Sequence, residues 1–71
     1  MVSAFELTAR TSLRSEASST SIVLERISEG TLMEVLEETN KYWWKVNLNG
    51  TEGYVKASYL IESEQQLNAS E

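Results

Sequence analysis

The chain has 71 residues, of which 41% are apolar and 24% are charged, and its formal net charge at pH 7 is −5. This length accommodates one domain at most, with enough apolar residues for a globular core. The sequence contains no cysteine and no histidine, which excludes disulfides, thiolate metal sites and the commonest general base, so we expect no enzymatic activity, no metal site and no cofactor.

Two segments open the chain. Along residues 4–10, Phe5, Leu7 and Ala9 alternate with polar residues, which is the period-2 pattern of a strand. Residues 15–21 are small and polar, and they predict a surface loop.

Residues 22–29 are compatible with two local structures. Val23 and Ile27 lie four positions apart, as on one face of a helix, but three β-branched residues in eight favour a strand or extended chain. The next elements are a break at Gly30, a strand at residues 32–37 and a turn at residues 39–41.

Residues 43–55 carry the clearest local pattern, two apolar-rich runs joined by Asn49-Gly50. This dipeptide is typical of a two-residue type I′ turn, because both of its positions need positive φ. The predicted register pairs Leu48 with Thr51, Val46 with Gly53, Trp44 with Val55 and Trp43 with Lys56.

This register divides the side chains of the hairpin between two faces. The face expected to pack into the core carries Trp44, Val46, Leu48, Thr51, Gly53 and Val55. The opposite face carries Trp43 and Tyr54 among polar residues, and we expect both rings to be exposed there. An exposed indole is a frequent contact for peptides or sugar rings. The alternative is that Trp43 leans over the sheet and covers the stems of Lys45 and Lys56.

The C-terminal part of the chain divides at residue 61. Residues 57–61 predict a short turn and a closing strand, which completes a domain over residues 1–61. Residues 62–71 lack a pattern and are expected to form a disordered acidic tail. Without this tail, residues 1–60 hold eight acidic against six basic side chains. This near-neutral balance gives no electrostatic reason to bind nucleic acid.

Several short strands with turn signals between them, and no long amphipathic helix, predict an all-β fold. Closure into a small barrel is expected because a flat sheet would leave unpaired edges. No segment approaches the roughly 20 apolar residues that a membrane-spanning helix needs.

Two groups of residues resemble a known family, the Src-homology-3 (SH3) domains. The hairpin and the residues after it are similar to the C-terminal half of these domains, in Trp43-Trp44-Lys45-Val46, Gly50, Gly53-Tyr54-Val55 and Tyr59-Leu60. The first half resembles the bacterial branch of the family, in Leu13-Arg14-Ser15, the serine-rich loop, Val23, Ile27, Gly30-Thr31 and Val35. The resemblance covers roughly residues 9–60.

The resemblance implies an SH3-like barrel of five to six antiparallel strands, a long first loop over residues 14–21 and a short helical turn near Ala57–Tyr59. It also implies that peptide-binding aromatic residues fall at Trp43, Tyr54 and Tyr59. Lys45 and Lys56 flank Trp43 in the predicted register, where they either steer an anionic group or deter aggregation of the sheet edge. The candidate ligand-binding residues are therefore Trp43, Tyr54, Tyr59, Lys45 and Lys56.

Members of the bacterial branch are often attached to cell-wall hydrolases or surface proteins. The resemblance thus implies a non-catalytic targeting module that recognises peptidoglycan peptides, extracellular or cell-wall associated if the chain is part of a longer exported protein. The alternative is a protein–protein interaction or self-assembly domain, such as a cytoplasmic adaptor, present as a monomer or weak homodimer. Single-stranded nucleic acid would also stack on exposed aromatic rings, but the charge balance disfavours it.

Overall fold

A computed structural model describes the backbone of residues 2–67 and the side chains of residues 4–63. No helix within this part of the chain is long and apolar enough to cross a membrane. In chain order the elements are β1 (Val2–Leu7), β2 (Thr11–Arg14), β3 (Val23–Ile27), β4 (Leu32–Glu37), β5 (Trp43–Leu48), β6 (Thr51–Lys56), the 3-10 helix η1 (Ala57–Tyr59) and β7 (Leu60–Leu67).

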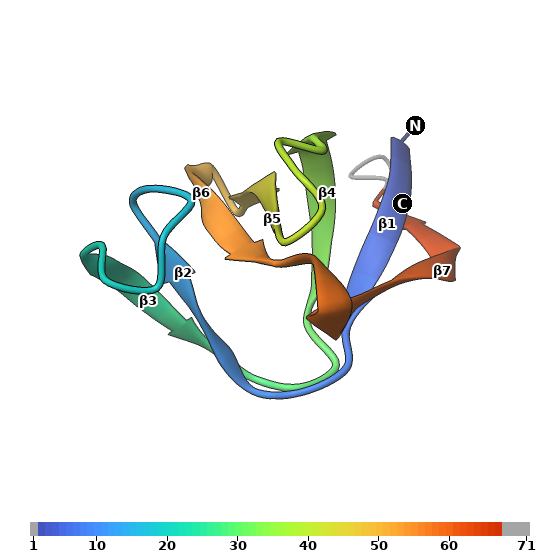
Figure 1. The fold of residues 1–71 in the computed structure, drawn as a ribbon. Coiled ribbons are helices and arrows are strands. Elements are labelled where there is room, and N and C mark those ends of the chain that lie inside the picture. The colour runs from blue at the N-terminus through green and yellow to red at the C-terminus, as the bar shows by residue number, and fades with distance from the viewer. Residues whose placement is uncertain (1, 68–71) are drawn as a thin grey trace.

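The strands form one antiparallel sheet of seven strands in the order β3-β2-β6-β5-β4-β1-β7. The sheet curls around an interior, with β3 and β7 at its two ends (Figure 1). The predicted all-β fold, a small antiparallel barrel, is confirmed. Residues 2–67 form seven strands, where the sequence predicted five to six.

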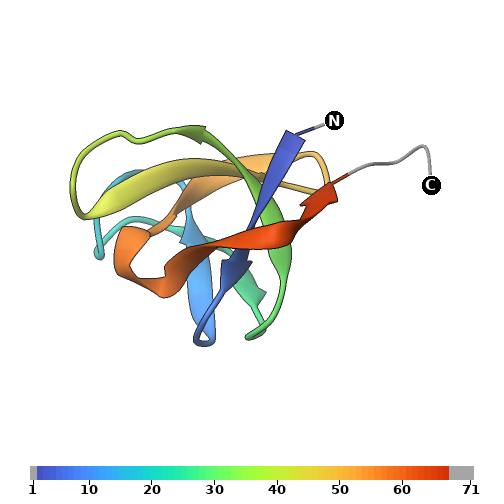
Figure 2. The ribbon, with the colours of Figure 1, turned by 90° about the vertical axis from the view of Figure 1, so that its right-hand side faces the viewer.

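The C-terminal strand corrects the prediction of a disordered tail. β7 continues to Leu67 and pairs with β1, placing Leu7 opposite Leu60 and Val2 opposite Leu67 (Figure 2). Residues 62–67 are therefore part of the sheet, because backbone N–H and C=O groups can pair whatever the side-chain pattern. The rest of the predicted tail, residues 68–71, lies outside the described residues.

The central hairpin has the predicted register in full. Trp43 pairs with Lys56, Trp44 with Val55, Val46 with Gly53 and Leu48 with Thr51. Asn49 and Gly50 have φ values of 52° and 93°, so both turn positions are left-handed, as a type I′ turn requires.

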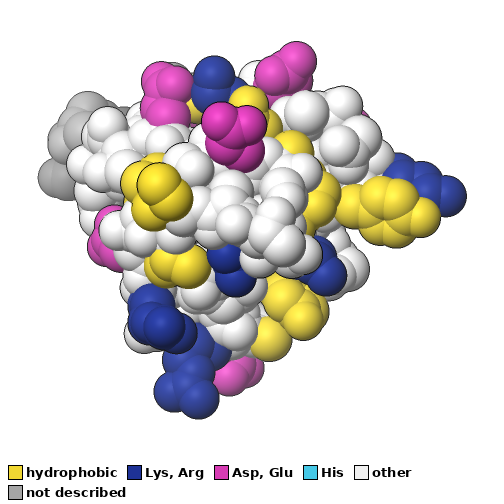
Figure 3. Space-filling view, turned by 60° about the vertical axis from the view of Figure 1, so that its left-hand side comes forward, with side chains coloured by type: hydrophobic (Ala, Val, Ile, Leu, Met, Phe, Trp, Pro, Cys, Tyr) yellow, Lys and Arg dark blue, Asp and Glu magenta, His cyan; other side chains and the backbone are white. Residues whose placement is uncertain are grey.

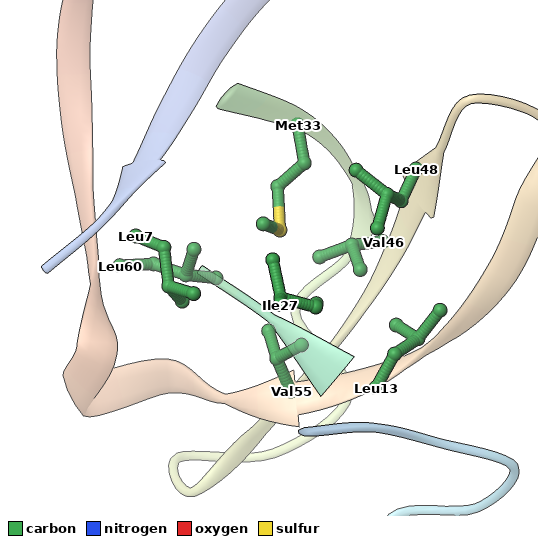
Figure 4. Packing of buried hydrophobic residues seen from close by; sticks show 8 residues of the cluster. All are labelled: Leu7, Leu13, Ile27, Met33, Val46, Leu48, Val55 and Leu60. Atoms are coloured by element: carbon green, nitrogen blue, oxygen red, sulfur yellow. The ribbon is translucent and has the colours of Figure 1, made fainter. Parts of the chain in front are cut away.

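The core takes at least one buried side chain from each of the seven strands (Figure 4). Its members are Leu7, Leu13, Ile27, Met33, Val46, Leu48, Val55 and Leu60. This confirms the inward orientation predicted for Val46, Leu48 and Val55. Trp44 is half-buried at the margin of this core, where its ring meets Phe5 edge-on, with centroids 5.7 Å apart. Thr51, expected on the core face, is exposed because it directly follows the turn.

The first predicted strand needs adjustment and one strand was not predicted, whereas segment 22–29 and the helical turn agree with the structures that the sequence favoured. The first strand ends at Leu7 instead of residue 10, and β2 is a separate strand that the sequence pattern does not predict. The ambiguous segment 22–29 contains a strand, β3, of which only Ile27 is buried. β3 lies at the end of the sheet, so one inward residue suffices and no alternation develops. The predicted helical turn is confirmed as η1.

Candidate functional site

An open cleft of about 490 Å³ lies where β2, β3, β5, β6 and η1 approach one another. This volume is within the range of ligand-binding pockets. Trp43 and Tyr59 supply its aromatic walls, and Thr11, Ser12 and Ser19 supply hydroxyl groups at its surface. The cleft therefore combines flat apolar surface with groups that both donate and accept hydrogen bonds.

The charged side chains that line the cleft are all basic: Arg10, Arg14, Arg26 and Lys56. They are four of the six basic residues in the chain. Figure 3 shows the side of the molecule that carries β2 and β3, where several Lys and Arg side chains lie over the middle and lower part, and others lie at the top and the right edge. The cleft is a local region of positive charge on an acidic protein.

The prediction that Trp43 is exposed is wrong, because the structure buries it. Its side chain retains 8% exposure, whereas Trp44, expected to be the buried member of the pair, is only half-buried. As the strand alternation predicted, Trp43 is not a member of the central core cluster. Lys56 lies over its ring, with Nζ 5.9 Å from the centroid, so neighbouring side chains cover much of the indole. Trp43 is thus a largely covered wall of the cleft and not a free platform, and the Lys56 ammonium lies over its ring.

Asn40 fixes the backbone at the start of β5. Its Oδ1 accepts hydrogen bonds from the backbone N–H groups of Tyr42, at 2.8 Å, and Trp43, at 2.9 Å. The N–H of Ala57 donates to the carbonyl oxygen of Tyr42 at 2.8 Å, which ties this turn to η1. The predicted turn at residues 39–41 thus sets the position of Trp43 in the cleft wall.

Tyr59 is held by a second set of backbone contacts. Its carbonyl oxygen accepts hydrogen bonds from the N–H of Thr8, at 2.7 Å, and from the hydroxyl of Thr8, at 3.1 Å. The Tyr59 side chain is partly buried against the core. These contacts fasten η1 to the segment that joins β1 to β2 and leave one side of the tyrosine facing the cleft.

The serine-rich loop is an ordered rim of the cleft. Ser15 N–H donates to the carbonyl oxygen of Ile22 at 2.9 Å, which closes the loop, and the Ser21 hydroxyl donates to the carbonyl oxygen of Ser18 at 2.7 Å. Arg14 Nη1 donates to the carbonyl oxygen of Ser21 at 2.8 Å. The guanidinium is therefore fixed against the loop while it lines the cleft.

The structure brings together three of the five predicted site residues. Trp43, Tyr59 and Lys56 line the cleft, whereas Lys45 and Tyr54 do not. Lys45 and Tyr54 face each other across the hairpin, and Lys45 Nζ lies 3.7 Å from a carboxylate oxygen of Glu52.

Sequence reasoning missed Arg10, Arg14 and Arg26. They lie on or beside β2 and β3, far from the hairpin in the sequence, and they reach it because β2 pairs with β6 through Arg14 and Tyr54. Composition gave the one available signal: these three arginines are half of the six basic residues in the chain. Nothing in the local pattern indicated that β2 would lie next to the hairpin.

A family model described as bacterial SH3 domain matches residues 9–61 of the chain. The matched region includes every residue that lines the cleft.

Proposed function

The chain belongs to the bacterial SH3 domain family, a family of binding domains, and on this premise we propose that its cleft recognises peptidoglycan peptides. In this role the domain is non-catalytic and targets a cell-wall hydrolase or surface protein to its substrate.

The observation that supports the proposal is the convergence of Trp43, Tyr59 and Lys56 on one cleft. Aromatic walls offer contact area to the aliphatic side chains of a short peptide. Hydroxyl groups at the rim match the amide groups of its backbone, which need both donors and acceptors. The lysine ammonium suits the free carboxylates that cell-wall stem peptides carry.

A titration with synthetic stem peptides tests this function. We expect saturable changes in the indole N–H signal of Trp43 and in the backbone amides of η1 at millimolar or lower peptide concentration. The indole signal of Trp44 serves as an internal control, because this ring packs against Phe5 and lies outside the cleft. Absence of any change at millimolar peptide, or changes centred on Trp44, would contradict the proposal.

The exposed edge of β3 favours a second candidate function, association with a protein. Ile22 and Leu24 retain 72% and 45% exposure on or beside a strand at the end of the sheet. Such an edge can pair with a strand of another chain. Sedimentation at several concentrations checks this: a dimer that forms in the native protein and is lost in Leu24→Lys supports association, and a monomer throughout excludes self-assembly.

A further inference from the structure

We propose that the cleft selects a short acidic peptide, one that presents at least two carboxylates to Arg14, Arg26 and their basic neighbours. This inference rests on the proposed binding function and adds the charge of the ligand to it.

Charge is distributed unevenly over the molecule. The chain has eleven acidic and six basic residues, yet the described residues that line the cleft include four basic ones and no acidic one. Among the described side chains outside the cleft, Lys41 and Lys45 stand against nine acidic residues. The molecule therefore concentrates positive charge at one place, and like charges that gather in a cleft favour an anionic ligand.

The cations of the cleft form no ion pair with the described part of the protein. Among the side chains that the structure describes, the one ion pair joins Lys45 to Glu52, away from the cleft. Arg10, Arg26 and Lys56 are exposed to solvent. No carboxylate within this part of the chain lies within 4 Å of these cations, so a ligand carboxylate can pair with them.

Part of the basic cluster is already ordered. Arg14 donates one hydrogen bond to the Ser21 carbonyl oxygen at 2.8 Å, which leaves its other N–H groups for a ligand. Arg26 lies opposite Ser12 on the neighbouring strand. Two guanidinium groups borne by paired strands β2 and β3 suit two separate carboxylates, each held by parallel N–H···O bonds.

The size of the cleft limits the length of the ligand. A nucleic acid or another long polyanion would extend past the cleft onto a surface whose described side chains include nine acids and two bases. Repulsion there acts over about 8 Å at physiological ionic strength. A ligand of a few residues stays within the 490 Å³ cleft and avoids this repulsion. The aromatic walls also suit the aliphatic parts of a peptide better than a sugar–phosphate backbone.

The probe for the test is an acetylated tripeptide with two glutamates around an alanine and a free C-terminal carboxylate. Its matched control has two glutamines and a C-terminal amide, so it keeps the shape and loses all three charges. We expect calorimetric binding of the acidic tripeptide, weakened by added salt, and binding at least about tenfold weaker for the amide, since charge-assisted hydrogen bonds are roughly twice as strong as neutral ones. Equal affinity for the two peptides would overturn the inference.

Two substitutions test whether the acidic tripeptide binds at the basic residues of the cleft. Arg26→Gln is expected to weaken binding of the acidic tripeptide about tenfold and to leave the amide unaffected. Lys41→Gln removes the same charge from an exposed residue outside the cleft, and it is expected to change the affinity less than twofold. Equal losses from both variants would show a general charge effect and would overturn a site at Arg26. Far-ultraviolet circular dichroism of each variant confirms that the sheet is retained.

Two further experiments distinguish a failure of the acidic specificity from a failure of the proposed peptidoglycan binding. Stem peptides with free or amidated carboxylates test the proposed function: if neither form binds while the acidic tripeptide does, the peptidoglycan assignment fails and the acidic specificity stands. If both forms bind equally, the acidic specificity fails and the peptidoglycan assignment stands. A hexathymidylate and inorganic tripolyphosphate complete the series, and tighter binding of either than of the acidic tripeptide would assign the cleft to a phosphate polymer instead.

Discussion

Gly53 lies in close contact with β2. A Cβ at this position would lie 2.7 Å from Leu13 Cγ and 2.8 Å from the carbonyl oxygen of Arg14. The second contact is with backbone and cannot be relieved by a rotamer change. The glycine is therefore required by space, and the pairing that brings Arg14 to the cleft depends on it.

We expect Gly53→Ala to lower the free energy of unfolding by about 2–3 kcal/mol, the upper part of the usual range for overpacking, because one clash is with backbone. Gly50→Ala is the matched control: its φ is +93°, and no atom lies within 4 Å of the added Cβ, so only the left-handed backbone is penalised, by about 1 kcal/mol. Urea denaturation measures both. A Gly53→Ala protein as stable as the native protein would show that β2 moves aside at no cost, and a loss no larger than that of Gly50→Ala would contradict the steric role of Gly53.

The two neighbouring tryptophans show what a residue pattern can predict. Alternation along a strand assigns Trp43 and Trp44 to opposite faces, and the register confirms this assignment. Exposure does not follow from the face, because the outer side of this sheet is covered where η1 and Lys56 approach Trp43. Solvent access depends on elements distant in sequence.

At the scale of an element, the turn before β5 is expected to position Trp43, and this role can be tested. Asn40 Oδ1 accepts two backbone hydrogen bonds, from Tyr42 and Trp43. We expect Asn40→Ala to lower the free energy of unfolding by about 1–2 kcal/mol, since each bond contributes about 0.5–1.5 kcal/mol, and to shift the indole signal of Trp43.

Asn40→Asp keeps the acceptor oxygen and is the control for this prediction. We expect it to retain most of the stability and the native Trp43 signal in two-dimensional spectra. If Asn40→Ala and Asn40→Asp behave alike, the acceptor is not what positions Trp43.

The sequence predicted some elements of the sheet in detail and others not at all. The hairpin of β5 and β6 was predicted in register because Asn49-Gly50 needs two positive φ values, a requirement met by local chemistry alone. β2, with four residues, and the outer part of β7 carry no such signal. Their positions come from backbone pairing with strands far away in the chain, which no local window contains. The basic half of the cleft was missed for the same reason.

At the scale of the whole molecule, the cleft and the β1–β7 pair lie in different parts of the sheet. The cleft is built on β2, β3, β5, β6 and η1, whereas β7 pairs with β1 at the other end of the strand order. Ligand binding and the closing of the sheet are therefore expected to be separable, and a truncation can test this.

The family match ends at residue 61, but β7 continues to Leu67. Ending the chain at residue 61 removes the partners of Val2, Ser3 and Phe5 in β1. We expect this truncation to lower the free energy of unfolding by about 2 kcal/mol, from a few backbone hydrogen bonds at about 0.5–1.5 kcal/mol each, and to speed amide exchange in β1.

A chain that ends at residue 67 is the control, because it keeps β7 and removes only the last four residues. Thermal or urea unfolding compares the two, and titration with the acidic tripeptide measures the cleft in each. We expect the shorter chain to be less stable but to bind with unchanged affinity wherever it is folded. Equal stability would instead show that β1 needs no partner beyond Ile61, and that residues 1–61 form the complete domain.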